Sequence, residues 1–224
     1  MSAGTALKLR KSDLLKVYRQ LLKAYGCQHW WPADSPFEVM VGAILTQNTA
    51  WPNVEKAIAN LKQAQLLSPE TVASASHDQV AELIRPSGYF NIKAQRLQAF
   101  CRFLLARGGE RMLRQEDTGT LRHDLLAVHG VGPETADDML LYAFERPVFV
   151  IDAYTRRIFS RLGMIVGGES YEALRRGFEV ALGPDVQLFN EYHALIVRHA
   201  KEACSKKPRC AECCLAGGCE EGGR

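Results

Sequence analysis

Apolar residues recur at three- and four-residue steps along most of the chain, which is the period of an amphipathic helix. Residues 36–49 are apolar on most sides, which predicts a buried helix. The one β-like stretch, residues 146–152, is too short and too isolated to form a sheet. The sequence therefore predicts an all-α fold, with helices over residues 11–25, 36–49, 51–64, 77–85, 93–108, 121–129, 133–144, 152–163, 170–182 and 188–204.

Composition narrows the class of protein. The chain has 224 residues, of which 47% are hydrophobic, and this is enough for a core in one large domain or two small ones. No stretch reaches the roughly 18 apolar residues of a membrane span, and no targeting segment is recognisable. We therefore expect a cytoplasmic protein with no membrane partner. The net charge of +3 is too small to indicate nucleic acid by itself.

A glycine-rich turn, "HGVGPETA", separates two of the predicted helices. Gly130 and Gly132 permit positive φ and let a ligand approach the backbone, and Pro133 suits the first position of the next helix. The first amides of that helix would form an anion site that suits a phosphate. Helix, Gly-Val-Gly, helix is the pattern of the helix-hairpin-helix, which binds the DNA backbone. An ordinary turn between two helices fits the glycines equally well.

Five of the seven cysteines crowd the C-terminus. In a chain without a secretion signal they are thiols or metal ligands before they are disulfides. Four of them have the spacing Cys204-x5-Cys210-x2-Cys213-x5-Cys219. Four thiolates in a short loop suit either zinc or an iron–sulfur cluster. Cys214 is interpreted as a bystander that could substitute for Cys213.

Four blocks of sequence together resemble one family, the endonuclease III-like helix-hairpin-helix (HhH-GPD) DNA glycosylases. The blocks are "AILTQNTAWPNVEKA", "SGYFNIKAQRL", "LLAVHGVGPETA" followed by "FVIDAYTRRI", and the cysteine loop. They lie in the family's order and span most of the chain. The resemblance implies two helical lobes, one over residues 34–145 that carries the hairpin, and one that combines residues 1–33 and 146–224.

The resemblance also implies a function in base excision repair. A DNA glycosylase hydrolyses the N-glycosidic bond of a damaged base flipped out of double-stranded DNA. Asp152 matches the essential aspartate, which stabilises the positive charge that develops on the sugar. By itself Asp152 also fits a helix N-cap, and the two roles are compatible. DNA is expected to bind across the cleft between the lobes, to a nucleoid-associated monomer, with Asp152 at the mouth of that cleft.

Further positions match the family's DNA-facing residues. Gln47 matches the side chain that fills the space of the flipped base, and Tyr89 matches the wedge that parts the base stack. For Tyr89, packing against its own domain is nearly as good an interpretation. The loop cations form a basic knuckle for phosphates. The DNA-binding set is Gln47, Tyr89, Gly130, Gly132, Thr135, Tyr154, Lys206 and Lys207.

Glu134 departs from the family's bifunctional members. Those members carry a lysine two positions after the second glycine of the hairpin, and its amine forms a Schiff base with the sugar. A carboxylate forms no imine, so Glu134 argues for a monofunctional enzyme that uses water. The position of Glu134 in the first turn of a helix also suits the helix dipole.

The glutamate, the segment "LTQNTAW" and the segment "HWWP" resemble the 3-methyladenine DNA glycosylase branch. Alkylated purines are often cationic, and an aromatic face attracts such a base. Trp30, Trp31 and Trp51 are therefore candidates for the base pocket, although we expect one or two of them to be buried in the core. The family also favours a [4Fe–4S] cluster over zinc for the loop of residues 204–219.

Three alternatives remain open. One is a bifunctional glycosylase/AP lyase that acts on oxidised pyrimidines, in which another lysine, Lys201 first, serves as nucleophile. Another is a glycosylase for mismatched thymine or uracil. The third is a non-catalytic protein that binds DNA structure, against which Asp152 in its motif argues.

Overall fold

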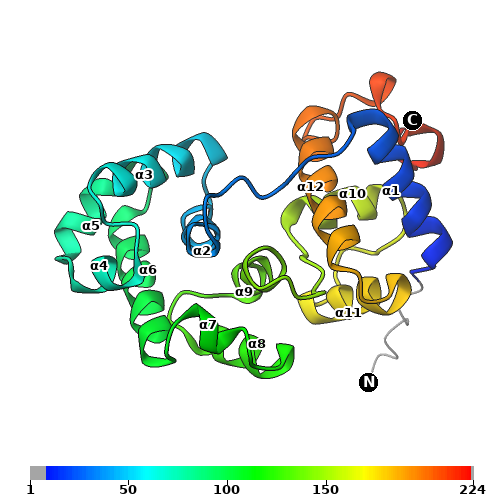
Figure 1. Cartoon of the computed structure of the whole chain (residues 1–224). Coiled ribbons are helices and arrows are strands. Elements are labelled where there is room, and N and C mark those ends of the chain that lie inside the picture. The colour runs from blue at the N-terminus through cyan, green and yellow to red at the C-terminus, as the bar shows by residue number, and fades with distance from the viewer. Residues whose placement is uncertain (1–8, 223–224) are drawn as a thin grey trace. The chain divides into compact units, whose positions relative to one another are not determined.

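The computed structural model describes residues 9–222, which are helical and contain no β-strand (Figure 1). The all-α prediction is confirmed. The α-helices are α1 (Lys11–Tyr25), α2 (Pro36–Leu45), α3 (Trp51–Gln63), α4 (Pro69–Ser74), α5 (His77–Leu83), α6 (Phe90–Ala106), α7 (Glu110–Leu113), α8 (Thr118–Ala127), α9 (Pro133–Asp138), α10 (Ala153–Arg161), α11 (Tyr171–Leu182) and α12 (Val186–Glu202). Short turns complete the set: η1 (Arg85–Ser87), the π-helical turn η2 (Met139–Ala143), η3 (Cys210–Glu212) and η4 (Ala216–Gly218).

Local sequence explains most helix starts. Side-chain oxygens of serine and aspartate accept a hydrogen bond from the third backbone N–H of the helix that follows, which satisfies a donor that has no partner inside the helix. In α2 the cap is Ser35, which is followed by a proline at the first helical position, where a missing N–H costs nothing. Other capping residues are Ser68, Ser76, Asp117, Asp152, Ser170 and Asp185.

The chain divides into two compact units, one over Trp31–Arg146 and one that combines the residues up to Trp30 with those from Pro147 onward. In the unit Trp31–Arg146, the apolar helix α2 is buried and contacts α3, α6, α9 and η2. Helices α4 and α5 pack on α6, and α8 packs on α9. The predicted burial of α2 follows from its lack of a polar face and is confirmed.

The other unit is organised around α12, which packs against α1 and α10 (Figure 1). Its core is rich in aromatic side chains. Phe149 stacks on Phe178 with ring centroids 4.5 Å apart, and it meets Phe189 edge to face at 5.3 Å. Tyr192 is buried among them and donates its hydroxyl to the carbonyl oxygen of Leu14 at 2.7 Å.

Several predicted boundaries were wrong. The helix expected over residues 36–49 ends at Leu45, because Thr46 begins a turn in which Asn48 has a positive φ of 53°. The short helices α4 and α7 were missed, since neither is long enough to show a helical period. The helix expected over residues 133–144 changes to a π-helical turn at Met139. The β-like run before Asp152 forms neither a helix nor a strand within residues 9–222.

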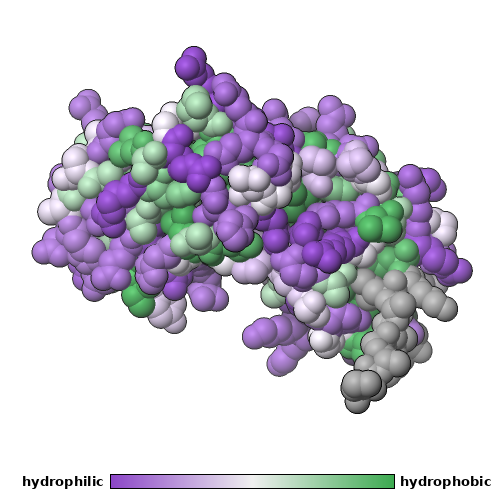
Figure 2. Space-filling view, turned by 90° about the horizontal axis from the view of Figure 1, so that it is seen from below, coloured by the Kyte–Doolittle hydropathy of each residue, from purple (hydrophilic) through white to green (hydrophobic). Residues whose placement is uncertain are grey.

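Polar residues dominate the face shown in Figure 2, with apolar side chains between them. The large apolar side chains that remain exposed are Tyr89, Ile92, Leu105, Met112, Val166 and Val180. Within residues 9–222, none of the helices combines the length and the apolar character needed to cross a bilayer.

Candidate active site

The glycine turn joins α8 to α9, and its two glycines have different conformations. Gly130 has a φ of 84°, which only glycine adopts readily, and a Cβ there would collide with the side chain of Arg96. Gly132 is extended, with a φ of −91°, and is exposed as the N-cap residue of α9. Gly130 therefore adopts the positive φ that a glycine permits, whereas Gly132 has a backbone conformation open to any residue. A Cβ at Gly132 would meet no atom of the chain within 4 Å.

Gln47 is fixed to this turn by its own hydrogen bonds. Its Nε2 donates to the carbonyl oxygen of Gly130 at 3.0 Å and to Oγ1 of Thr135 at 2.9 Å. Its Oε1 accepts a hydrogen bond from the guanidinium of Arg96. These contacts join residues 83 positions apart in sequence and define which way the carboxamide faces. The structure therefore brings Gln47, Gly130 and Thr135 together, and Arg96 is a partner that the sequence reasoning missed.

Tyr89 lies in an exposed loop immediately before α6. Its side chain is 69% exposed and its backbone is left-handed, with φ 46° and ψ 32°. This conformation is costly for a residue with a side chain, and strained positions of this kind cluster at functional sites. The exposure argues against the alternative that Tyr89 packs on its own domain.

A buried lysine joins the Tyr89 segment to the Gln47 segment. Lys93 is 1% exposed, and its Nζ donates to the carbonyl oxygens of Leu45 and Ser87, both at 2.7 Å. Burial and the nearby charge of Arg96 lower the pKa of the Lys93 amine to about 8. Leu45 ends α2 shortly before Gln47, and Ser87 ends η1 shortly before Tyr89, so one amine holds both segments.

Three aromatic side chains of the same unit form a cluster. Trp31 meets Trp51 edge to face with ring centroids 5.1 Å apart, and it lies 5.2 Å from Tyr142 at an interplanar angle of 58°. The indole Nε1 of Trp51 donates to Glu55 Oε1 at 2.9 Å. Tyr142 belongs to the π-helical turn η2, and π-turns often mark functional sites. The sequence reasoning had missed Tyr142.

None of the three candidate tryptophans is fully buried. Trp30, Trp31 and Trp51 are all half-buried, so the expectation that one or two belong to the core was wrong. Trp30 is the last residue of the N-terminal segment of the other compact unit.

Asp152 caps α10 and is 8% exposed. Its Oδ1 accepts hydrogen bonds from the backbone N–H of Thr155 at 2.6 Å and from the Thr155 hydroxyl at 2.8 Å. Its Oδ2 lies 3.5 Å from Nε2 of His193, which is 6% exposed. Burial raises the pKa of the Asp152 carboxyl, but His193 and Thr155 together outweigh burial and lower the pKa below its usual value. The residue is therefore a buried carboxylate at neutral pH.

Glu134 occupies the first turn of α9 and is exposed. It lies in the unit Trp31–Arg146, whereas Asp152 lies in the other unit. Tyr154, on the first turn of α10, is half-buried, and the guanidinium of Arg157 lies over its ring, 5.1 Å from the centroid.

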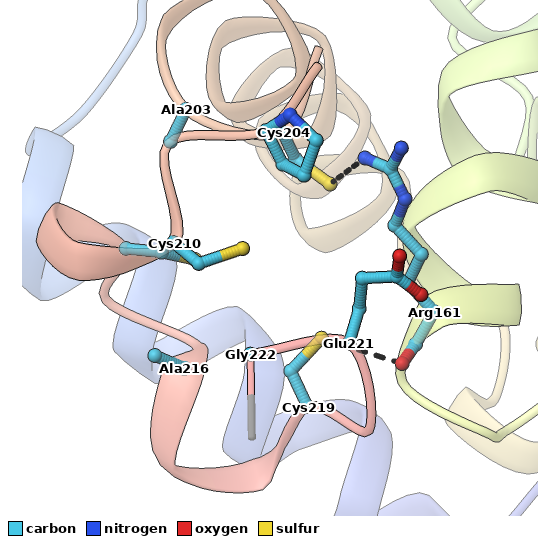
Figure 3. A pocket seen from close by; sticks show the side chains of 10 residues that line it. Arg161, Ala203, Cys204, Cys210, Ala216, Cys219, Glu221 and Gly222 are labelled. Atoms are coloured by element: carbon cyan, nitrogen blue, oxygen red, sulfur yellow. Dashed lines mark hydrogen bonds between the residues drawn. The ribbon is translucent and has the colours of Figure 1, made fainter. Parts of the chain in front are cut away.

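The four regularly spaced cysteines line one small pocket after α12 (Figure 3). The thiols of Cys204, Cys210 and Cys219 face its interior. Cys213 lies 3.6 Å from Nε2 of His199, and the hydroxyl of Tyr25 lies 2.8 Å from Nδ1 of the same ring. Cys214, the remaining cysteine of the C-terminal segment, is not among the residues that line the pocket.

Two arginines of α10 hold this loop. Arg161 donates to the Cys204 sulfur at 3.2 Å and to the Ser205 carbonyl oxygen at 2.7 Å, and its own carbonyl oxygen accepts from the Cys219 thiol at 3.3 Å. Arg157 donates to the Cys204 carbonyl oxygen at 2.8 Å. The expected DNA-contacting cations Lys206 and Lys207 are both exposed on the loop.

The donor set of the pocket suits a metal centre. Cysteine thiolates are the ligands of both zinc and iron–sulfur clusters, and four cysteines line this one pocket. Within residues 9–222, no three Cys, His, Asp or Glu side chains already lie close enough to bind one metal ion.

Comparison with known proteins agrees with this geometry. Residues 41–184 match the family described as HhH-GPD superfamily base excision DNA repair protein. The chain is 48% identical over 211 residues to the "Putative DNA repair glycosylase" of Methanocaldococcus jannaschii, which covers 92% of this chain and 96% of that protein. It is 29% identical over 209 residues to endonuclease III of Thermotoga maritima, with 92% and 91% covered.

Solved structures share the fold. A 3-methyladenine DNA glycosylase of H. pylori bound to 1,N6-ethenoadenine superposes with a TM-score of 0.75 at 31% identity, covering 87% of this chain and 98% of that one. A non-covalent endonuclease III–DNA complex superposes with a TM-score of 0.83 at 21% identity, covering 96% and 98%. The family match, the close relative and the hairpin geometry lead to one conclusion: the chain belongs to the HhH-GPD superfamily of base excision DNA repair proteins.

Proposed function

We propose that this DNA glycosylase hydrolyses the N-glycosidic bond of alkylated purines in double-stranded DNA and leaves the abasic strand intact. The observation that carries the proposal is Asp152, a buried carboxylate held at the start of α10. As the base departs, positive charge develops on the sugar, and a carboxylate fixed in a dry environment stabilises that charge more strongly than one in water.

Water is the nucleophile in this proposal. Attack of water at the anomeric carbon forms the new C–O bond while the C–N bond to the base breaks, and the departing base carries away the electron pair. Asp152 accepts or orients the proton of that water. Glu134, exposed on α9 at the position where lyase members have an amine, provides no imine-forming group.

The aromatic cluster supports a purine substrate. Trp31, Trp51 and Tyr142 offer electron-rich faces next to one another, and stacking plus cation–π attraction is worth about 1–3 kcal/mol per base. The H. pylori relative, at 31% identity, is a 3-methyladenine DNA glycosylase bound to 1,N6-ethenoadenine. An alkylated purine already has a weak glycosidic bond, so stacking and one carboxylate suffice without a strong general acid.

Each compact unit carries residues that match DNA-facing positions of the family. In the unit Trp31–Arg146, Gln47 lies against the hairpin and Tyr89 projects from an exposed loop, as expected for a space-filling residue and a wedge. In the other unit, Lys206 and Lys207 are exposed on the cysteine loop. The four regularly spaced cysteines would hold a [4Fe–4S] cluster in the pocket of that loop, and the bound cluster would supply a rigid support for the segment that carries these lysines.

Base release from defined duplexes tests the proposal. We expect the purified protein to release 7-methylguanine or 1,N6-ethenoadenine and to leave an abasic strand that breaks only after alkali. Asp152→Asn should keep duplex affinity within about threefold and lose at least about a hundredfold in single-turnover rate, since a neutral amide does not stabilise the sugar cation. A matched control is Asp185→Asn, because Asp185 is also an N-cap aspartate but is exposed.

Borohydride trapping separates the main alternative. The relationship to endonuclease III makes a glycosylase/AP lyase for oxidised pyrimidines the second candidate. Only an imine is reduced to a covalent adduct, so the wild-type protein should not be trapped on abasic DNA. Trapping of wild type, lost in Lys201→Ala, would replace the proposal with the lyase. Release of thymine or uracil from mismatches, without alkylated purine, would replace it with a mismatch glycosylase.

A further inference from the structure

The two carboxylate oxygens of Asp152 have different surroundings. Oδ1 takes both hydrogen bonds from Thr155, one from the backbone N–H and one from the hydroxyl. These bonds belong to the cap of α10 and are local, because they span three residues. They leave Oδ2 as the oxygen available to interact outside the cap.

Oδ2 faces a histidine from a distant part of the chain. His193 lies on α12, which packs against α10, and its Nε2 is 3.5 Å from Oδ2. Both side chains are buried, Asp152 at 8% and His193 at 6% exposed. The distance fits an ion pair and is long for a hydrogen bond, as is common for catalytic contacts before substrate is bound.

Three other polar side chains, on α10, α11 and α12, have hydrogen-bond partners of their own. On α12, Tyr192 donates its hydroxyl to the Leu14 carbonyl oxygen on α1. On α11, the hydroxyl of Tyr171 accepts from the backbone N–H of Ile151 at 3.4 Å. On α10, Arg156 donates to the carbonyl oxygen of Glu169 at 2.8 Å. Among the described residues, His193 is the side chain that most strongly lowers the pKa of the Asp152 carboxyl.

We propose that His193 is a positioning residue that orients the reactive carboxylate of Asp152 and keeps it ionised, through contact of Nε2 with Oδ2. The proposal rests on the proposed function for the role of Asp152 in base release. Thr155 fixes one oxygen and His193 fixes the other, so the plane of the carboxylate is defined by α10 and α12 together. Without His193, only the local cap would hold the group.

The direction of the titration supports the geometry. Burial alone would raise the pKa of the Asp152 carboxyl and favour its neutral form. His193 is the largest influence that opposes burial, ahead of the two bonds from Thr155. Removing the imidazole should therefore raise the pKa of Asp152 and leave less carboxylate near the acidic limit of activity, while the cap of α10 stays intact.

A direct titration tests this inference without any need for activity. The full-length protein is labelled with 13C at aspartate carboxyl carbons, and the Asp152 resonance is identified by its loss in Asp152→Asn. Chemical shifts are followed from pH 3 to 8 in wild type, His193→Gln and His193→Leu. His193→Gln keeps an N–H donor and lacks the charge. His123→Gln on α8 is the matched control, because His123 is exposed and lies in the other compact unit.

We expect the midpoint of Asp152 to rise by at least about one pH unit in His193→Leu, which is a tenfold change in proton affinity, and by less in His193→Gln. The control should match wild type. In parallel, the single-turnover rate of 1,N6-ethenoadenine release is measured as a function of pH. The acidic limb of this pH–rate profile should shift to higher pH, more in His193→Leu than in His193→Gln. A purely structural role of His193 would lower the rate at every pH and leave the limb in place.

An unchanged midpoint for Asp152 in both variants overturns the inference. A raised midpoint with an unshifted acidic limb also overturns it, because Asp152 would then respond to His193 without that response controlling the reaction. If wild type releases no base while the midpoint rises as expected, the proposed function fails and the coupling between the two side chains stands. If His193→Leu does not fold, His193→Gln carries the comparison.

Discussion

Replacing the buried lysine, Lys93→Met, should make the stability of the protein respond differently to pH. Methionine has a similar length and no amine. In the wild-type protein the amine is 1% exposed and bonds to two backbone carbonyl oxygens, while burial and Arg96 lower its pKa to about 8. In the unfolded chain the same amine titrates near 10.4.

The two pKa values set the direction of the effect. Between about pH 8 and 10, the unfolded chain binds a proton at Lys93 that the folded protein has released, so the free energy of unfolding rises with pH in this window. Below pH 8 both states are protonated, and burial of the charged amine costs its full amount. From the lowered pKa we work out a gain of about 2–3 kcal/mol for wild type between pH 7 and pH 10.

The loss of the hydrogen bonds acts at every pH. Removing the amine deprives the carbonyl oxygens of Leu45 and Ser87 of this donor, which costs about 1–3 kcal/mol for each buried acceptor left without a partner. Near pH 7 this cost is offset because the variant buries no charged amine, so the free energy of unfolding of Lys93→Met should be within about 3 kcal/mol of the wild-type value. At pH 10 the offset is gone and the difference between the two proteins should widen by about 2–3 kcal/mol.

Urea unfolding at half-unit steps from pH 7 to 10 measures both proteins under identical conditions. Other groups titrate in this range, but they do so in both proteins and cancel in the difference. Parallel curves for wild type and Lys93→Met would refute the assignment of a buried, pKa-lowered amine. The same variant should weaken duplex binding, because Lys93 joins the segment that precedes Gln47 to the one that precedes Tyr89.

Three further predictions concern single contacts. Arg96→Ala removes the donor to Oε1 of Gln47 and should weaken duplex binding about threefold to tenfold in a binding titration, with a stability change of about 1 kcal/mol; unchanged binding would contradict the network. Tyr89→Gly should raise the free energy of unfolding by about 1 kcal/mol, because φ is 46° there, while lowering the single-turnover rate; a lower free energy of unfolding would contradict the strain assigned to this backbone position. Metal analysis should show a loss of bound iron in Cys210→Ser and none in Cys214→Ser, because Cys214 lies outside the pocket; equal loss in both variants would contradict the proposed set of four ligands.

The helical character of the protein follows from local sequence. Apolar residues at helical spacing, and serine or aspartate at the N-caps, act within a few residues of one another, so they can be recognised without knowing the fold. Boundaries were less predictable. The end of α2 at Leu45 and the π-helical turn at Met139 depend on what α2 and α9 pack against, which no local window contains.

The residues of the candidate site also fall into a group that the sequence reveals and a group that it does not. Asp152, Glu134 and the four cysteines stand out in sequence because their chemistry depends on residue type and short spacing. Their partners do not stand out. Arg96 looks like any helical arginine, and His193 looks like any buried histidine on an amphipathic helix.

Only the tertiary structure decided which side chains meet. Gln47 reaches Gly130 across 83 residues of sequence because α2 packs against α9. His193 reaches Asp152 because α12 packs against α10. Helix packing is driven by non-directional burial of apolar surface, and many sequences satisfy it in many registers. Local sequence therefore specified the chemical groups, whereas the pairing of those groups, and the pKa values that result, depended on the packing of helices distant in the chain.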